Sequence, residues 1–448
     1  MSRPALNADQ QQAVNMIAAF IVGPDKEFFL TGAPGVGKTF TTRELTETLG
    51  QVIKNYHTAM GKDDHRHKTI MLTSTTNKAA AVLSEATNAF ATTIHSFLGV
   101  APKKDFTTGQ TYLAKNNKWK VHSNEIIFID EASMIEQNLY NLIHEATDSS
   151  CKIIYIGDKN QLAPVMEKLS PAVQLANNPS LHYEITTPVR NAGSYGLIAL
   201  CDRLREDILT EAPRDNLTHW LQVPGEIEHI DGDQLRALVN QIYGPGGSVK
   251  SEDRELSCRI LAFTNKTVIG YNEHIRSLRG LPNHPVPGEY LICNNHFPIS
   301  NSLSFSVEEE LFIHSVTGPD SIKIDLYNSL DAYAVDVSSM SSTRTTVYVA
   351  ANKLQYEILF KHYKDKKDWK AFYRLQESFI DLRNREAATV YKAQGSTYDS
   401  VIMIMDDIFT STDINQLRRM LYVGASRAKK KVYVYDKGIH ENKRGIYL

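Results

Sequence analysis

The chain has 448 residues, of which 42% are hydrophobic and 22% are charged, and its formal net charge is −2. This composition is typical of a globular protein of about three domains, and the lack of a long uninterrupted apolar run excludes a membrane anchor. Because the net charge is close to zero, affinity for nucleic acid has to come from a local basic surface.

The polar residues after Met1 do not form an apolar signal core, so we expect no secretion. The four cysteines are scattered without the spacing of metal ligands, at Cys151, Cys201, Cys258 and Cys293. We therefore expect reduced thiols, no zinc site and a cytoplasmic location, which would be the host-cell cytoplasm if the chain is phage-encoded.

A complete phosphate-binding loop lies near the start of the chain. It follows an apolar strand over residues 28–31, precedes a helix over residues 40–49, and consists of Gly32, Ala33, Pro34, Gly35, Val36, Gly37, Lys38 and Thr39. In such a loop backbone N–H groups surround the phosphates, the lysine reaches the β and γ oxygens, and the hydroxyl ligates Mg²⁺. The motif predicts binding of ATP and Mg²⁺; the plain alternative is a glycine-rich turn.

Short apolar runs rich in β-branched and aromatic residues recur at residues 69–72, 126–129, 153–156, 260–263, 401–404 and 432–435. Continuous rather than alternating hydrophobicity is typical of parallel strands that are covered on both faces. The pattern predicts an α/β protein with doubly wound sheets, whose ligands lie at the carboxyl ends of the strands.

Two of these runs end in polar side chains with a chemical use. Asp130 and Glu131 follow the run 126–129, and Gln161 follows the run 153–156. A phosphate-loop enzyme needs one carboxylate for Mg²⁺ and a second group to orient the attacking water. We assign Asp130 to the metal and Glu131 to the water, and we expect Gln161 to sense the γ-phosphate or that water.

Two regions interrupt the α/β pattern. Residues 100–123 are polar, and their centre at 106–112 predicts a hairpin with Gly109 in the turn. Residues 285–364 read as short strands with serine-rich joints, which predicts a small β-rich insertion. The glycine-rich residues 243–248 predict an exposed loop.

The sequence Gly-Asp-Lys-Asn-Gln-Leu-Ala-Pro-Val at residues 157–165 resembles the third signature of superfamily 1 helicases. Order and spacing are most similar to the branch that contains RecD and Dda, and the resemblance covers nearly the whole chain. Further segments that resemble this family are residues 6–10, 74–80, 93–96, 185–191, 262–266, 369–379, 388–396 and 421–428.

The resemblance implies roles for residues outside the phosphate loop. Gln10 would bind the adenine, and Gly395 would lie at the nucleotide. Arg190 and Arg427 would reach the γ-phosphate, and an arginine in that position accelerates hydrolysis by ~10³ to 10⁵. The implied contacts with DNA are Thr76, Asn77, His95, Tyr391 and Lys392.

The chain departs from the family pattern at four places. Tyr391 replaces a histidine, Asn7 and Ser426 replace threonines, and Thr75 replaces a common proline. The departures bear on the DNA contact at Tyr391 and on the geometry at Asn7, and they leave the ATPase assignment intact.

Several candidate residues have a structural alternative. Gln10 could be an exposed residue of the first helix, and His95 a satisfied structural histidine. We favour Tyr112 as the aromatic that wedges into a duplex, because it follows the hairpin turn and base stacking is worth about 1 to 3 kcal/mol. Phe106, Tyr112 and Trp119 could instead pack the hairpin onto its neighbour. A phosphate path or a solvated basic face would both account for Lys103, Lys104, Lys115, Lys118 and Lys120.

The sequence thus predicts an ATP-dependent DNA helicase, a DNA-stimulated ATPase that acts on single-stranded and forked DNA in replication and repair. The resemblance implies 5′-to-3′ movement, allows replication or recombination proteins as partners, and fits a monomer. It also predicts the domains: residues 1–180 as RecA-like domain 1A with a pin hairpin at 100–123, residues 181–284 and 379–448 as domain 2A, and residues 285–378 as an SH3-like insertion 2B with a hook.

Two other functions are compatible with a phosphate loop. An ATP-gated switch would bind DNA or remodel protein on it without processive unwinding, and the hairpin with Tyr112 argues against it. A metabolic kinase would leave the second set of arginines and the β-rich insertion without a role.

Overall fold

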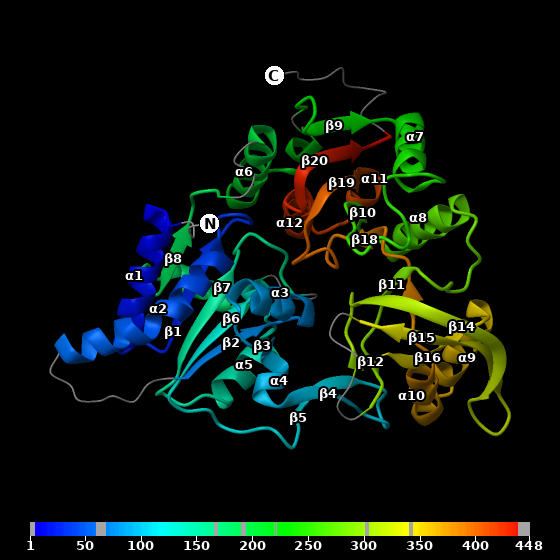
Figure 1. The fold of residues 1–448 in the computed structure, drawn as a ribbon, viewed down its shortest axis with the longest axis horizontal. Helices are drawn as coiled ribbons and strands as arrows, with labels where there is room; N and C mark the ends of the chain where they lie inside the picture. Colours follow the sequence, from blue (N-terminus) through cyan, green and yellow to red (C-terminus); the bar gives the residue numbers. More distant parts are fainter. Residues whose placement is uncertain are drawn as a thin grey trace. The chain divides into compact units, whose positions relative to one another are not determined.

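The computed structural model describes residues 5–59, 69–164, 169–189, 194–218, 220, 222–300, 304–339 and 344–437. The chain divides into two compact units, each described separately below (Figure 1). The first contains Met1–Lys103, Leu113–Ala212 and Arg418–Ser426, and the second contains Lys104–Tyr112, Pro213–Leu417 and Arg427–Leu448. Among the described helices none is long and apolar enough to cross a membrane.

The first unit is built on a sheet of six parallel strands. Their order is β3 (Ala91–Thr93), β2 (Thr69–Ser74), β6 (Glu125–Asp130), β7 (Lys152–Gly157), β1 (Glu27–Gly32) and β8 (His182–Ile185). The apolar positions of the central strands are buried on both faces, as their continuous hydrophobicity predicts.

Helices cover both faces of this sheet. One face packs against α1 (Ala8–Val22), α2 (Lys38–Ala59) and α3 (Asn77–Thr87). The other packs against α4 (Ile94–Leu98), α5 (Gln137–Glu145) and the 3-10 turn η2 (Pro171–Asn177). A further helix, α6 (Tyr195–Leu209), follows β8 along the chain. The predicted α/β class is therefore confirmed for this unit.

The predicted hairpin consists of β4 (Val100–Lys104) and β5 (Thr111–Lys115). Residues 106–112, expected to form the whole hairpin, are mostly its turn, and the strands lie further out; Gly109 is in the turn, as predicted, with a φ of 72°. A Cβ on Gly109 would lie 2.5 Å from the Trp369 ring, and Lys104 pairs with Glu377 at 2.7 Å. Both partners belong to α10 (Trp369–Ser378), so the hairpin tip packs on this helix within the second unit.

The second unit contains a second parallel sheet, in the order β18 (Ala387–Thr389), β10 (Cys258–Ala262), β19 (Tyr398–Ile404), β20 (Ala428–Tyr435) and β9 (Ile227–Ile230). Its apolar core includes side chains of α7 (Gly232–Tyr243) and α8 (Asn265–Leu278). Two further helices, α11 (Met405–Ile408) and α12 (Ile414–Ala425), follow β19. Residues 244–248 form a loop, as predicted, whereas Tyr243, expected in the same loop, is the buried last residue of α7.

An antiparallel sheet follows in the same unit, in the order β16 (Thr345–Ala350), β15 (Ser329–Ser338), β14 (Glu310–Lys323), β11 (Tyr290–Cys293) and β17 (Leu382–Arg383). A small pair, β12 (Phe297–Pro298) and β13 (Ser304–Phe305), precedes β14. The predicted β-rich stretch 285–364 is wrong at its end, since Lys353–Asp365 is helix α9. Its apolar residues recur at helical spacing and pack against α10: Tyr356, Leu359, Phe360 and Tyr363. The pin and SH3-like identities and the domain bounds stay predictions.

Buried ion pairs join α8 to the segments beside the antiparallel sheet. Arg276 of α8 pairs with Glu289 at 2.9 Å, and both side chains are less than a tenth exposed. Glu289 immediately precedes β11 and also accepts a hydrogen bond from the backbone of Val286 at 2.7 Å. Because an unpaired charge in such a place is costly, this pair holds the start of the antiparallel sheet on α8.

We predict that Glu289→Gln lowers the free energy of unfolding by about 3 kcal/mol, because it leaves the buried Arg276 charge uncompensated. Urea unfolding followed by circular dichroism measures the loss. Asp233→Asn is the matched control, because Asp233 and Arg236 form a pair that is 89% and 75% exposed and should add little stability. Equal losses in the two variants would contradict the prediction.

Candidate functional site

Three neighbouring strands of the first unit end in the predicted motifs. In sheet order these strands are β6, β7 and β1, which end at Asp130, Gly157 and Gly32. Since the strands are parallel, their carboxyl ends meet at one edge of the sheet. The phosphate loop, the acidic pair and the loop that carries Gln161 therefore start side by side.

Residues of the phosphate loop contact one another and the end of the neighbouring strand β8. The ammonium group of Lys38 donates to the carbonyl oxygens of Gly32 and Ala33 at 2.7 and 3.1 Å. A Cβ on Gly32 would lie 2.6 Å from the carbonyl oxygen of Ile185, so only glycine fits there. Gly37 has a φ of 88°, in the left-handed region that favours glycine.

The acidic pair is shaped by burial and by backbone strain. Burial, and then the charge of Glu131, raise the pKa of Asp130 to about 7, whereas the charge of Lys38 opposes the shift. Glu131 has a φ of 55°, which is rare for a residue with a Cβ and recurs at functional sites. Its backbone N–H donates to the Asp130 carboxylate at 2.9 Å. The Asp130 carboxylate together with the Thr39 hydroxyl is an oxygen donor set that suits Mg²⁺.

The loop after β7 is held by the second half of α12, which belongs to the same unit. Arg419 donates to the carbonyl oxygens of Lys159 and Gln161 at 2.8 and 2.6 Å. The hydroxyl of Tyr422 donates to the Asp158 carboxylate at 2.6 Å. The side-chain oxygen of Gln161 is buried without a hydrogen-bond partner among the described residues, so it is an acceptor that a ligand or water can satisfy.

Gln10 contacts the phosphate loop directly. Its side-chain nitrogen donates to the carbonyl oxygen of Val36 at 3.0 Å, and its oxygen accepts from the backbone N–H of Asn7 at 3.1 Å. Asn7 in return caps α1, so its replacement of threonine preserves a capping box. Gln10 is 2% exposed, and the alternative of an exposed residue is therefore wrong. Its contact with adenine stays a prediction.

The predicted DNA contacts of the first unit lie beyond β2 and β3. Thr76 caps α3 by accepting from the N–H of Ala79 at 3.2 Å, and Thr76 and Asn77 are exposed. The backbone N–H of Thr75 donates to the carbonyl oxygen of Asp130 at 3.3 Å, a bond that proline could not form. His95 lies on α4, where burial lowers its pKa and favours the neutral ring.

The candidate residues of the second unit are already engaged. The hydroxyl of Tyr391 accepts from the side chain of Gln416 at 2.7 Å. Lys392 pairs with Glu308 at 3.5 Å and also donates to Asn294. Arg427 is buried and donates to the carbonyl oxygen of Ser396 at 3.2 Å.

Some roles from the resemblance stay predictions. Gly395, in the turn after Lys392, has a φ of 73°. Arg190 lies outside the described residues. The approach of Arg427 and of Gly395 to a nucleotide stays a prediction.

The aromatic residues of the hairpin differ in exposure. Tyr112 on β5 is 49% exposed and Phe106 in the turn is 58% exposed. Phe106 packs edge-on against Tyr373 of α10 at 5.4 Å between ring centroids, while Trp119 packs on the core of the first unit. Tyr112 thus keeps a free face, whereas Phe106 and Trp119 have structural contacts.

Sequence reasoning missed three residues that hold the site. They are Arg419, Tyr422 and Asp9, whose carboxylate accepts from the backbone N–H groups of Thr186 and Thr187 after β8; none of the three carries chemistry in a phosphate-loop motif. Arg419 and Tyr422 lie three residues apart on α12, so helical spacing places them on one face. No sequence signal connects them to the loop after β7, because that contact depends on the fold.

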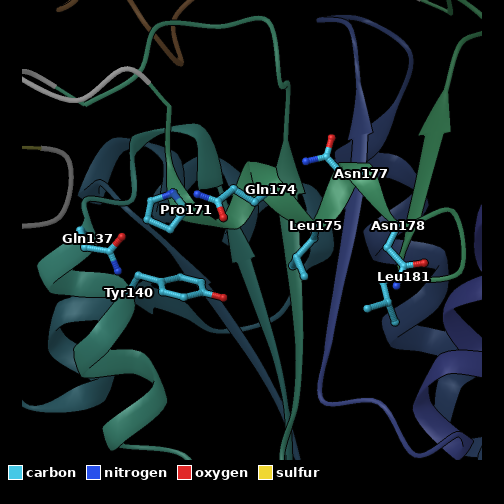
Figure 2. Close-up of a pocket in the computed structure, with 8 residues that line it drawn as sticks. All are labelled: Gln137, Tyr140, Pro171, Gln174, Leu175, Asn177, Asn178 and Leu181. Atoms are coloured by element: carbon cyan, nitrogen blue, oxygen red, sulfur yellow. The ribbon is translucent and has the colours of Figure 1, made fainter.

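A pocket of about 430 Å³ lies elsewhere in the first unit, between α5 and η2 (Figure 2). Tyr140 lines it and bonds to Glu27, the first residue of β1, whereas the phosphate loop follows the last residue of that strand. The pocket therefore lies at the end of β1 away from the phosphate loop.

Comparisons with known proteins match both halves of the chain. A family model described as an AAA domain matches residues 10–167, and one described as a UvrD-like helicase C-terminal domain matches residues 386–435. The ATP-dependent DNA helicase dda of Enterobacteria phage T4 is 23% identical over 96% of this chain and 98% of its own length. The ATP-dependent RecD2 DNA helicase of Deinococcus radiodurans is 28% identical over 55% of this chain and 30% of its own length. A solved Pif1 helicase from Candida albicans has 17% identity and a TM-score of 0.45 over 97% of this chain and 95% of that chain.

We predict that Gly37→Ala weakens nucleotide binding at least about tenfold, because a φ of 88° disfavours alanine and a Cβ there would displace the Gln10 amide nitrogen, which lies 2.4 Å away. Titration with a fluorescent ATP analogue measures the effect. Gly50→Ala is the matched control, because Gly50 lies in α2 with no heavy atom within 4 Å of an added Cβ. The control should bind normally and gain up to about 1 kcal/mol of stability; normal binding by Gly37→Ala would contradict the prediction.

Proposed function

We propose that this chain, a superfamily 1 helicase of the RecD and Dda type, uses ATP hydrolysis to move 5′-to-3′ along single-stranded DNA and to separate a duplex. The observation that supports this most directly is the shared sheet edge at the ends of β6, β7 and β1. The loops that carry Lys38 and the pair Asp130 and Glu131 begin side by side at this edge. Direction rests on the resemblance to the RecD and Dda branch.

In this proposal the phosphate loop binds the triphosphate through its backbone N–H groups. Lys38 exchanges the carbonyl oxygens of Gly32 and Ala33 for phosphate oxygens. Mg²⁺ would be held by Thr39 and Asp130, where it would neutralise charge on the phosphates. Glu131 accepts a proton from the water that attacks the γ-phosphorus, and the bond from this phosphorus to the oxygen of ADP breaks.

Arginines complete the reaction in this proposal. Arg190 and Arg427 stabilise charge on the γ-phosphate, so that closing around the nucleotide and hydrolysis become one event. Alternation between a closed and an open state changes the grip on DNA. Thr76, Asn77 and His95 in one unit, and Tyr391 and Lys392 in the other, would provide that grip.

The hairpin would act as the pin that separates the strands. Two contacts with α10 support its tip: Gly109 packs closely against the Trp369 ring, and Lys104 forms an ion pair with Glu377. A supported tip can resist the force that a duplex exerts when DNA is drawn past it. A cytoplasmic site of action, monomeric state and protein partners from replication or recombination stay predictions.

Unwinding of two duplexes that differ only in the end carrying a single-stranded tail tests the function. We expect strand displacement with the 5′ tail, little with the 3′ tail, and none by Lys38→Ala, which lacks the group that reaches the β and γ oxygens. ATP turnover without a displaced strand on either substrate would favour the ATP-gated switch. Displacement from the 3′ tail alone would contradict the direction, and DNA-stimulated hydrolysis by Lys38→Ala would contradict the site.

Tyr112→Ala should separate movement from unwinding. Since a stacked base is worth about 1 to 3 kcal/mol, we expect the unwinding rate to fall about tenfold, while ATPase activity on single-stranded DNA is retained. Tyr195→Ala is the matched control, because Tyr195 is 79% exposed at the start of α6, away from the hairpin in sequence. Equal unwinding by the two variants would reject Tyr112 as the wedge.

A further inference from the structure

Asp9 binds the segment that follows β8. One carboxylate oxygen accepts from the backbone N–H groups of Thr186 and Thr187 at 2.7 and 2.8 Å, and from the Thr186 hydroxyl at 3.2 Å. The other accepts from the hydroxyl of Tyr183 at 2.7 Å. Partial burial opposes ionisation, but the bonds from Tyr183, Thr187 and Thr186 keep the pKa of Asp9 below its ordinary value. The ionised carboxylate is thus the form that makes these bonds.

The segment bound by Asp9 in turn contacts the phosphate loop. The backbone N–H of Val189 donates to the carbonyl oxygen of Gly35 at 2.9 Å. Residues 186–189 are all exposed, so burial of their side chains contributes little to holding them in place. Among the described residues, hydrogen bonds to Asp9 at one end and to Gly35 at the other restrain this segment.

Gln10, the neighbour of Asp9, binds the same loop. Gln10 donates to the carbonyl oxygen of Val36, which follows Gly35. Two consecutive residues in the first turn of α1 thus act on two consecutive carbonyl groups of the phosphate loop, Gln10 directly and Asp9 through residues 186–189. Orienting these carbonyls also orients the peptide N–H groups that face a phosphate.

We propose that Asp9 is a positioning residue of the phosphate loop, which it holds in its phosphate-binding conformation through residues 186–189. The role rests on the proposed binding of ATP and adds a group that touches neither nucleotide nor DNA. Without Asp9, part of the nucleotide's binding energy has to be spent on ordering the loop.

Titration calorimetry with ADP tests the proposal. We expect Asp9→Ala to weaken ADP binding about tenfold. Asp9→Asn should weaken it less, because its amide oxygen can still accept from Thr186 and Thr187. Asp25→Ala is the matched control, since it removes an exposed carboxylate just after α1 and should bind ADP like the unaltered chain. If the unaltered chain does not bind ADP, the proposed function fails; if it binds and Asp9→Ala binds equally well, only the role of Asp9 fails.

Hydrogen exchange followed by mass spectrometry separates positioning from a general loss of structure. In Asp9→Ala we expect faster exchange in the peptide over residues 183–189 and also in the phosphate loop, with β6 and β7 unchanged. Faster exchange in the first peptide with an unchanged phosphate loop would overturn the proposal. Tyr183→Phe keeps the bonds to Thr186 and Thr187 and should show little change in either peptide. Asp9→Asn covers the case in which Asp9→Ala does not fold: it should show a smaller increase in exchange in both peptides, and no increase in the phosphate loop would overturn the proposal.

Discussion

Parallel pairing of β7 with both β1 and β6 is the constraint on which the candidate site depends. In this register Thr31 lies opposite Gly157, and Ile129 lies opposite Tyr155, so the three strands end at nearly the same level. Their side chains are buried on both faces, and a shift in register would break packing on two sides at once. The rigid sheet therefore fixes where three otherwise irregular loops begin.

Those loops have backbone conformations that would be unfavourable in an isolated peptide, and contacts with neighbouring elements stabilise them. Glu131 has a positive φ, and the close approach of Ile185 to Gly32 leaves no room for a side chain. Hydrogen bonds from Arg419 and Tyr422 of α12 hold the loop after β7. Arg427 follows α12 closely along the chain and immediately precedes β20.

Sequence reasoning identified what local chemistry determines. The six apolar runs are strands and the phosphate loop lies between a strand and a helix, because these features follow from hydrophobic patterning and glycine spacing. It failed at residues 353–364, where lysines and tyrosines hid the helical spacing of α9. It also missed Asp9, which reads as an ordinary acid in a first helical turn; its partners Thr186 and Thr187 are close only because β8 pairs with β1. Contacts of this kind depend on strand order, which no local pattern encodes.

In the second unit, the motif residues expected to bind DNA already have partners within the protein. Glu308 pairs with Arg259 at 2.7 Å and with Lys392 at 3.5 Å, and burial lowers the pKa of Lys392 while Glu308 opposes the shift. A DNA phosphate can therefore engage Lys392 only by competing with Glu308, which would still be neutralised by Arg259. Tyr391 is similarly bonded to Gln416, whose oxygen accepts from Ser411 at 2.8 Å. At the position where the family pattern has histidine, this chain thus has a hydrogen bond between Tyr391 and Gln416 of α12.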